Sequence, residues 1–179
     1  MNIPNSITLI RMILVPVIVW LILAGQMYAA FIVFLLAGAS DALDGMIAKH
    51  FNLVTPLGTY LDPLADKILL VSIYVTLGVQ GELPNWLVIL VVSRDILIVG
   101  GILFTSVLGF KVEIVPSQVS KLNTFCQIGL AALVLGNQGF DFHGIGGLIS
   151  ISVFIVGLTT VLSGVSYILQ WARQNGQNA

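Results

Sequence analysis

Residues 41–67 read DALDGMIAKHFNLVTPLGTYLDPLADK and hold four of the eight acidic residues in a chain of 179 residues. The whole chain is 58% hydrophobic and only 8% charged, which is typical of an integral membrane protein and not of a soluble domain. An ionised Asp at the centre of a membrane-spanning helix costs roughly 2.5–3.5 kcal/mol on insertion, so four would cost on the order of 10–14 kcal/mol. Bound metal ions are the natural compensation for that cost.

The spacing of this stretch predicts a metal site shared by two helices. The positions that recur at helical spacing are Asp41, Asp44, Gly45 and Ala48 on one helix, and Gly58, Asp62 and Asp66 on the next. Two helices that face each other across a short loop would bring the four carboxylates together, and two divalent cations would neutralise them. Oxygen ligands favour Mg²⁺ or Mn²⁺ over zinc, which usually recruits His or Cys. The chain has only two His and one Cys.

The same residues resemble the signature of the CDP-alcohol phosphatidyltransferases, D-x2-D-G-x2-A-R-x8-G-x3-D-x3-D. Every position matches in register except Lys49, which stands where the family usually has Arg. Lys keeps the positive charge but loses the planar fork with which Arg binds a phosphate through two hydrogen bonds. The departure therefore concerns the contact with the diphosphate and leaves the reaction class unchanged.

The resemblance implies one membrane domain, residues 1–179, that displaces CMP from a CDP-linked lipid. An acceptor hydroxyl would attack the phosphorus attached to the lipid, with two Mg²⁺ or Mn²⁺ ions as cofactors. The implied metal ligands are Asp41, Asp44, Asp62 and Asp66, and Asp66 would also act as general base. The residues implied to line the nucleotide site are Gly45, Ala48, Lys49 and Gly58.

The N-terminal segment has two interpretations. Asn5, Thr8 and Arg11 resemble the PN-x2-T-x2-R start of many family members, which lies close to the nucleotide-diphosphate site. That reading gives Asn5 and Thr8 to the nucleotide and Arg11 to a phosphate. The alternative is an amphipathic segment, residues 1–12, that caps the first helix and anchors it at the membrane interface.

The apolar runs predict an all-α integral membrane protein with six transmembrane helices. The expected spans are residues 13–24, 27–49, 57–79, 85–108, 117–135 and 145–171, with a polar loop at 137–144 and a frayed tail at 172–179. An even number of spans places both termini on one side. The Lys and Arg residues outside the spans gather at one set of helix ends, so we expect cytoplasmic termini and an active site that faces the cytoplasm.

Two further blocks carry candidate acceptor-binding residues. Arg94 stands in the middle of a span beside Asp95, where it either forms an intramembrane ion pair or binds a phosphate. Lys121 and Asn123 begin the fifth span in the sequence SKLNT. For Lys121, holding an anionic acceptor and anchoring the helix end at the interface are both open.

The blocks SRD and SK-x-NT indicate the branch of the family that makes phosphatidylglycerol and cardiolipin. They resemble the eukaryotic type of cardiolipin synthase, which uses phosphatidylglycerol as acceptor. Members that use glycerol 3-phosphate tend to carry a second Lys where this chain has Asn123. One cation fewer suits a phosphodiester better than a dianionic phosphate, so we expect phosphatidylglycerol as acceptor, with glycerol 3-phosphate as the alternative.

The expected partners are CDP-diacylglycerol, a glycerol-containing acceptor, the lipid bilayer of a bacterial or mitochondrial inner membrane and a second copy of the chain, with no nucleic acid. A carboxylate-lined metal transporter is the alternative from another class. A transporter predicts acidic residues along a path through the bilayer, whereas these aspartates gather at one end, and Glu82 and Asp141 fall in the opposite loops.

Overall fold

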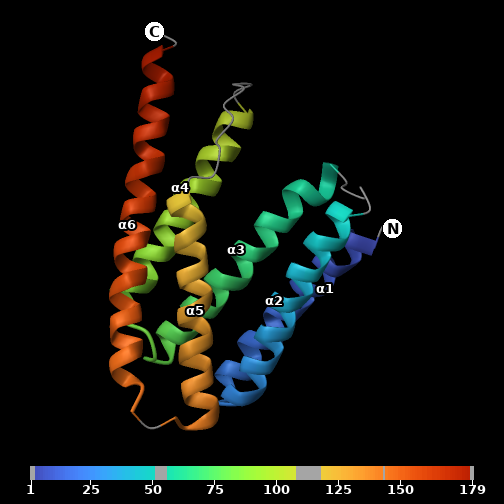
Figure 1. Ribbon diagram of the computed structural model, residues 1–179, viewed down its shortest axis with the longest axis vertical. Helices are drawn as coiled ribbons and strands as arrows, with labels where there is room; N and C mark the ends of the chain where they lie inside the picture. Colours follow the sequence, from blue (N-terminus) through green and yellow to red (C-terminus); the bar gives the residue numbers. More distant parts are fainter. Residues whose placement is uncertain (1–2, 51–55, 108–117, 143, 178–179) are drawn as a thin grey trace. The chain divides into compact units, whose positions relative to one another are not determined.

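The structure, a computed structural model, is all-helical over the residues it describes. The backbone is described for residues 3–50, 56–107, 118–142 and 144–177, and the side chains for residues 10–40, 65–100, 118–142 and 144–170. The helices of this part of the chain (Figure 1) are α1 (Ile3–Leu23), α2 (Met27–His50), α3 (Pro56–Val79), α4 (Asn85–Val107), α5 (Gln118–Phe140) and α6 (Gly146–Gln177).

The helices divide into two compact units. Unit 1 comprises Met1–Glu82 and Ala131–Ile145, and therefore holds α1, α2, α3 and the C-terminal part of α5. Unit 2 comprises Leu83–Leu130 and Gly146–Ala179, and holds α4, the first part of α5 and α6. The candidate metal ligands thus belong to unit 1, and the candidate acceptor residues of the fourth and fifth helices belong to unit 2.

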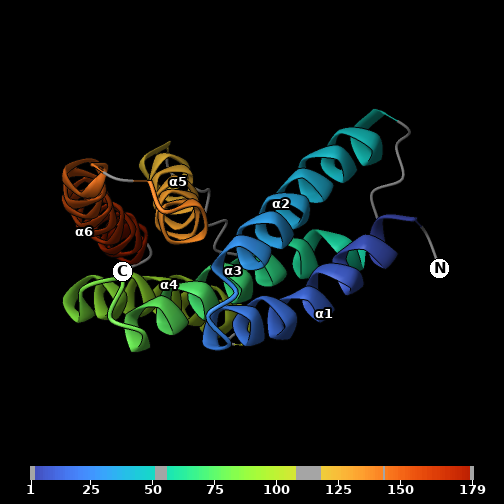
Figure 2. The same cartoon turned by 90° about the horizontal axis from the view of Figure 1, so that it is seen from below.

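Unit 1 is built on α1, which packs along both α2 and α3 (Figure 2). Ile18 and Ile22 of α1 are fully buried and lie one turn apart, and Ile73 and Leu77 of α3 repeat the same spacing. Pro16 lies inside α1 without ending it. The N-terminal segment is therefore helical from Ile3 and continuous with the first apolar run.

Helices α1 and α3 of unit 1 each end in a glycine with the same backbone motif. Gly25 has φ +73° and Gly81 has φ +79°, the left-handed conformation that glycine adopts without a steric penalty. After α1, the amide of Gln26 donates to the carbonyl of Leu21 at 2.9 Å, and the amide of Gly25 donates to that of Ile22 at 3.0 Å. This pair of bonds is a Schellman motif, which turns the chain sharply into α2.

Helix α5 is longer than the sequence predicts, because it continues to Phe140 through residues expected to form a polar loop. A Cβ atom at Gly139 would lie 2.8 Å from the Cα of Tyr28, so glycine lets α5 approach the start of α2. The ring of Phe140 meets that of Tyr28 edge to face, with centroids 5.0 Å apart. Gln138 also donates a hydrogen bond to Glu82. These contacts stabilise the last turn of α5, whose own residues favour a loop.

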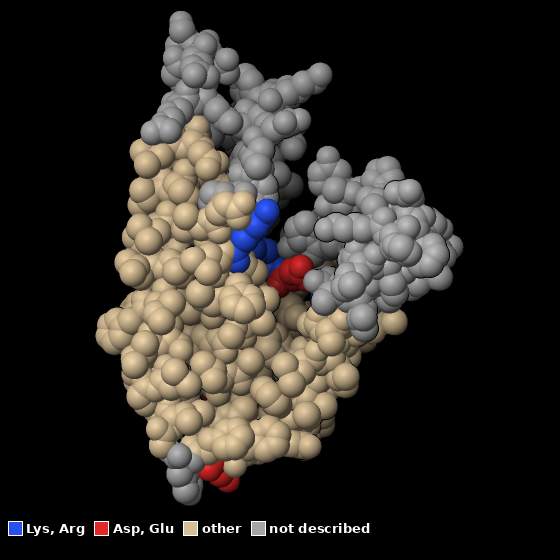
Figure 3. Space-filling model, in the orientation of Figure 1, with Lys and Arg blue, Asp and Glu red and all other residues tan. Residues whose placement is uncertain are grey.

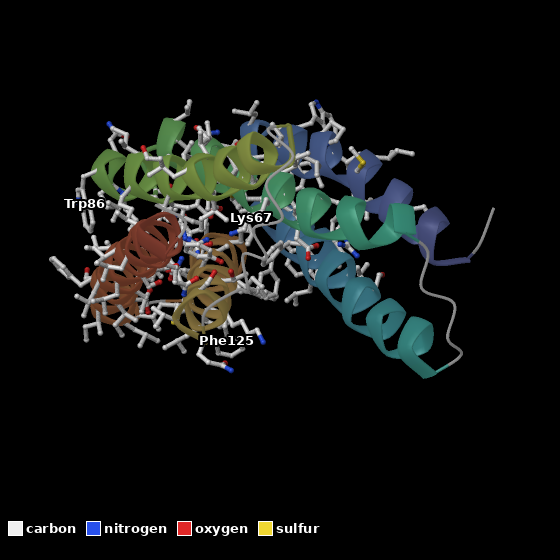
Figure 4. The ribbon with its side chains drawn as sticks, turned by 90° about the horizontal axis from the view of Figure 1, so that it is seen from above. Lys67, Trp86 and Phe125 are labelled. Carbon is white, nitrogen blue, oxygen red and sulfur yellow. The ribbon has the colours of Figure 1, made fainter. Side chains whose placement is uncertain are left out.

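In unit 2, α4 packs against α6. A Cβ atom at Gly157 would lie 2.9 Å from the Trp86 ring, which therefore needs a glycine beneath it. Figure 4 shows Trp86 at the start of α4 beside α6. Helix α6 runs to Gln177, past the expected end of the last span at residue 171.

Two helices in the described part of the chain, Gln118–Phe140 and Gly146–Gln170, are long and apolar enough to cross a membrane. Shorter apolar helical stretches cover Ile10–Leu23 and Met27–Ser40. The outer face of α6 exposes large apolar side chains, among them Phe154 at 71% and Leu158 at 63%. Figure 3 shows a face on which most described side chains carry no charge. The expected six spans stay a prediction.

Candidate functional site

The signature residues fall on two helices of unit 1. The backbone of α2 carries Asp41 and Asp44 near its C-terminal end, and α3 carries Asp62 and Asp66 in its first turns. Both helices pack against α1. The side chains that lie outside the described residues are those of Asp41, Asp44, Asp62, Gly45, Ala48, Lys49, Gly58, Asn5 and Thr8.

Asp66 is the signature aspartate whose side chain is described. The Asp66 side chain is 43% exposed and forms a salt bridge with Arg11, whose Nη1 atom donates to Asp66 Oδ1. The Arg11 side chain is only 3% exposed. The two residues are 55 positions apart in the sequence, so the packing of α1 on α3 brings them together. The next residue, Lys67, is half-buried and is labelled on α3 in Figure 4.

The pairing with Arg11 has a chemical consequence for Asp66. A buried guanidinium that bonds a carboxylate fixes the direction in which that carboxylate points. An ionised carboxylate that remains partly exposed can accept a proton or ligate a hard cation. The structure therefore joins two residues that the sequence assigns separately, one to a phosphate and one to metal and proton transfer.

The donor set of unit 1 fits a hard divalent cation, because carboxylate oxygens are the ligands that Mg²⁺ and Mn²⁺ prefer. Among the described side chains, no three His, Cys, Asp or Glu residues gather into a possible metal site. Three of the four signature aspartates lie outside those side chains, so the two-cation site stays a prediction.

Arg94 lies inside unit 2 at 4% exposure and is surrounded by protein donors and acceptors. Its Nη1 atom donates to Asp95 Oδ1 at 2.6 Å, and Asp95 is itself 3% exposed. Its Nε and Nη2 atoms donate to Ser163 Oγ, and Nη2 also donates to Ser120 Oγ at 2.5 Å. The Tyr167 ring lies 5.8 Å below the guanidinium carbon. The ion pair is thus present, and two serines fix the guanidinium plane.

Asn123 of α5 is fully buried and is hydrogen-bonded to two residues of α6. Its Oδ1 atom accepts hydrogen bonds from Thr159 Oγ1 at 2.8 Å and from Thr160 Oγ1 at 2.9 Å. Its Nδ2 atom is buried and has no hydrogen-bond partner among the residues that the structure describes. The two threonines fix which way the amide points.

Other faces of α5 carry exposed side chains. Lys121 is exposed. Phe125 is 74% exposed and points away from the helices in Figure 4. Lys121 and Asn123, which are two positions apart in the sequence, therefore occupy a surface position and a buried position.

The residues that hold Arg94 and Asn123 in place have no role that the sequence alone predicts. They are Ser120 on α5 and Thr159, Thr160, Ser163 and Tyr167 on α6. A signal was available, because Ser120, Asn123 and Gln127 occur at i, i+3 and i+7 of α5. Polar residues at helical spacing within an apolar run indicate a face buried against other helices.

A comparison with protein-family models matches residues 1–171 to the CDP-alcohol phosphatidyltransferase family. The signature and all six helices lie at least partly within the matched range.

Curated relatives include both CDP-diacylglycerol--glycerol-3-phosphate 3-phosphatidyltransferases and cardiolipin synthases. The CDP-diacylglycerol--glycerol-3-phosphate 3-phosphatidyltransferase of Rickettsia typhi is 32% identical over 93% of this chain and 94% of its own length. A cardiolipin synthase (CMP-forming)/mitochondrial hydrolase fusion protein of Schizosaccharomyces pombe is 34% identical over 93% of this chain. A chloroplastic CDP-diacylglycerol--glycerol-3-phosphate 3-phosphatidyltransferase 1 of Oryza sativa is 34% identical over 97% of it. The match spans 30% of the yeast protein and 58% of the rice protein.

Proposed function

Because the chain belongs to the CDP-alcohol phosphatidyltransferase family, we propose that it transfers the phosphatidyl group of CDP-diacylglycerol to the hydroxyl of a glycerol-containing acceptor. The acceptor oxygen forms a bond to the lipid-linked phosphorus, the bond from that phosphorus to CMP breaks, and the hydroxyl proton passes to a base. The observation that supports this most strongly is the aspartate signature at residues 41–66, inside a family match over residues 1–171.

In this proposal the residues of unit 1 hold the donor and move the proton. Asp41, Asp44, Asp62 and Asp66 would hold two Mg²⁺ or Mn²⁺ ions, which when bound neutralise the diphosphate charge and stabilise the departing CMP. The Asp66 carboxylate accepts the proton of the acceptor hydroxyl. Arg11, which pairs with Asp66, holds that carboxylate in its orientation.

The nucleotide end of the donor would lie along α2 and the start of α3. Gly45, Ala48 and Gly58 are small enough to leave room for it, and Asn5 and Thr8 of α1 would supply hydrogen bonds. Lys49 would contact a phosphate. This assignment follows the family signature.

Lys49→Arg should keep the activity, whereas Lys49→Glu should raise the KM for CDP-diacylglycerol about tenfold to a hundredfold. The reason is that a charge-assisted contact to phosphate contributes about 1.5–3 kcal/mol. Initial rates of CMP release against CDP-diacylglycerol concentration measure the effect. An unchanged KM in the Glu variant would mean that Lys49 does not contact the donor phosphate and only anchors the helix end at the membrane surface.

For the acceptor we propose phosphatidylglycerol, which makes the product cardiolipin. The relatives do not decide between the acceptors, because both types match at similar identity. The support comes from unit 2, where Arg94 is already paired with Asp95 and the neighbouring buried donor is the neutral Asn123. A dianionic phosphomonoester would need more positive charge than these residues offer.

Phosphatidylglycerol should therefore be used at least about tenfold more efficiently than glycerol 3-phosphate, since one missing charged contact costs about 1.5–3 kcal/mol. Side-by-side assays with radiolabelled acceptors measure the ratio. Asn123→Lys should shift the ratio toward glycerol 3-phosphate. Formation of labelled phosphatidylglycerophosphate without any cardiolipin would show that glycerol 3-phosphate is the acceptor.

We also propose that the chain spans the inner membrane six times, with cytoplasmic termini, and assembles as a homodimer. The support is the composition, the distribution of Lys and Arg, and the two helices long and apolar enough to span. The aspartates would then face the soluble pool into which CMP is released.

A further inference from the structure

We propose that Thr160, assisted by Thr159, orients the Asn123 amide so that its NH₂ group donates hydrogen bonds to the phosphodiester of the acceptor lipid. The inference rests on the proposed function, because it names the group that recognises the acceptor. Asn123 is the specificity-determining residue in this account, and the two threonines are positioning residues.

The first support is the orientation of the amide. Both threonine hydroxyls lie within 2.9 Å of Asn123 Oδ1, so the oxygen faces α6, while the nitrogen has no bond to α6 among the described residues. Thr159 Oγ1 also lies 2.9 Å from the carbonyl oxygen of Ile155 in its own helix, so its single proton is shared. Thr160 makes the more dedicated bond to Asn123, and we therefore assign it the larger share of the orientation.

The second support is the unsatisfied donor. Asn123 is 0% exposed, and its Nδ2 atom has no partner among the described residues. Proteins rarely leave a buried amide donor unpaired, because its loss of hydration is then uncompensated. An acceptor oxygen supplied by a ligand removes the penalty, and a phosphate oxygen is a strong acceptor.

The third support is the register between Asn123 and Arg94. On α5, Ser120 holds Arg94 and Asn123 lies three residues later; on α6, Ser163 holds Arg94 and Thr160 lies three residues earlier. On each of these two helices, the serine that bonds Arg94 and the residue that takes part in the Asn123–Thr160 bond are three positions apart, which is an axial rise of about 4.5 Å. The guanidinium is already bonded to Asp95, Ser120 and Ser163, so the Asn123 amide is the group that donates to the phosphodiester.

The competing explanation is that Asn123, Thr159 and Thr160 only join α5 to α6. In that case loss of the hydroxyl would lower stability without changing acceptor use. A change in KM for the acceptor at unchanged kcat separates the two, because a purely structural contact does not distinguish free from acceptor-bound protein.

The test measures CMP release by the purified 179-residue chain in detergent micelles, against phosphatidylglycerol concentration and at saturating CDP-diacylglycerol. Thr160→Val, which keeps the shape and removes the hydroxyl, should raise the KM for phosphatidylglycerol about tenfold, with kcat within about twofold. Thr160→Ser should restore the wild-type KM. The matched control is Thr76→Val, because Thr76 is a buried threonine of α3 whose hydroxyl bonds its own helix at Ser72. It should leave the KM unchanged.

The outcomes are distinguishable. If the wild type releases CMP but the KM of Thr160→Val equals that of Thr76→Val, the inference is wrong while the proposed function stands. If the wild type releases no CMP with any acceptor, the proposed function itself fails. Asn123→Asp gives an independent reading, because a carboxylate cannot donate and repels the phosphate. Its use of phosphatidylglycerol should fall at least about a hundredfold, and wild-type use of the lipid by this variant would overturn the proposal.

Discussion

Replacing any one of the four signature aspartates by asparagine should lower the rate of CMP release by about a thousandfold. Asn has nearly the same volume as Asp but lacks the negative charge that ligates a hard cation, and at Asp66 it also cannot accept a proton. Loss of a general base alone typically costs a factor of about 10²–10⁴, and loss of a metal ligand removes charge stabilisation at the phosphorus. Initial rates with Mg²⁺ or Mn²⁺ measure the effect.

The matched control is Asp141→Asn, which changes an exposed aspartate outside the signature. Asp141 has φ +51°, a conformation that Asn tolerates well, so this variant should fold and turn over normally. Full turnover by the Asp41, Asp44 or Asp62 variants, or by the wild type in excess chelator, would contradict the two-cation site.

The second large effect concerns stability. Arg94→Met should lower the free energy of unfolding by about 3–5 kcal/mol, because it leaves the buried charge of Asp95 without its cation. The same change removes the bonds to Ser120 and Ser163 that join the guanidinium to α5 and α6. Denaturant unfolding in micelles, followed by circular dichroism, measures the loss.

A second substitution separates the charge from the packing. Adding Asp95→Asn to Arg94→Met should recover part of the lost stability, since no buried charge then remains unpaired. If Arg94→Met unfolds at the wild-type denaturant concentration, the buried ion pair does not stabilise unit 2.

The sequence predicts the helices well where hydrophobicity changes abruptly. The segment expected at residues 27–49 is observed as a helix over Met27–His50. The segment expected at residues 85–108 is observed as a helix over Asn85–Val107. The prediction was wrong at the end of α5, where Asn137 and Gly139 resemble a loop. The contacts of Gly139 and Phe140 with Tyr28 come from a segment more than a hundred residues away, so no local pattern shows them.

In the candidate site, too, the features set by local sequence could be predicted and those set by helix packing could not. Helical spacing and the family signature place the aspartates on adjacent helices, yet neither pairs Arg11 with Asp66, because that contact depends on how α1 packs on α3. The sequence leaves Arg94 open between an ion pair with Asp95 and a phosphate contact, and the structure shows the ion pair. The serines and threonines of α6 that orient Arg94 and Asn123 are ordinary residues of an apolar helix until the fold brings them into contact.

The most direct test of the account is CMP release from CDP-diacylglycerol by the purified chain, with phosphatidylglycerol, with glycerol 3-phosphate and with no acceptor. The account predicts release that requires both an acceptor and Mg²⁺ or Mn²⁺ and that disappears in Asp66→Asn. A folded protein that releases no CMP with either acceptor, but moves these cations across liposome membranes, would contradict it.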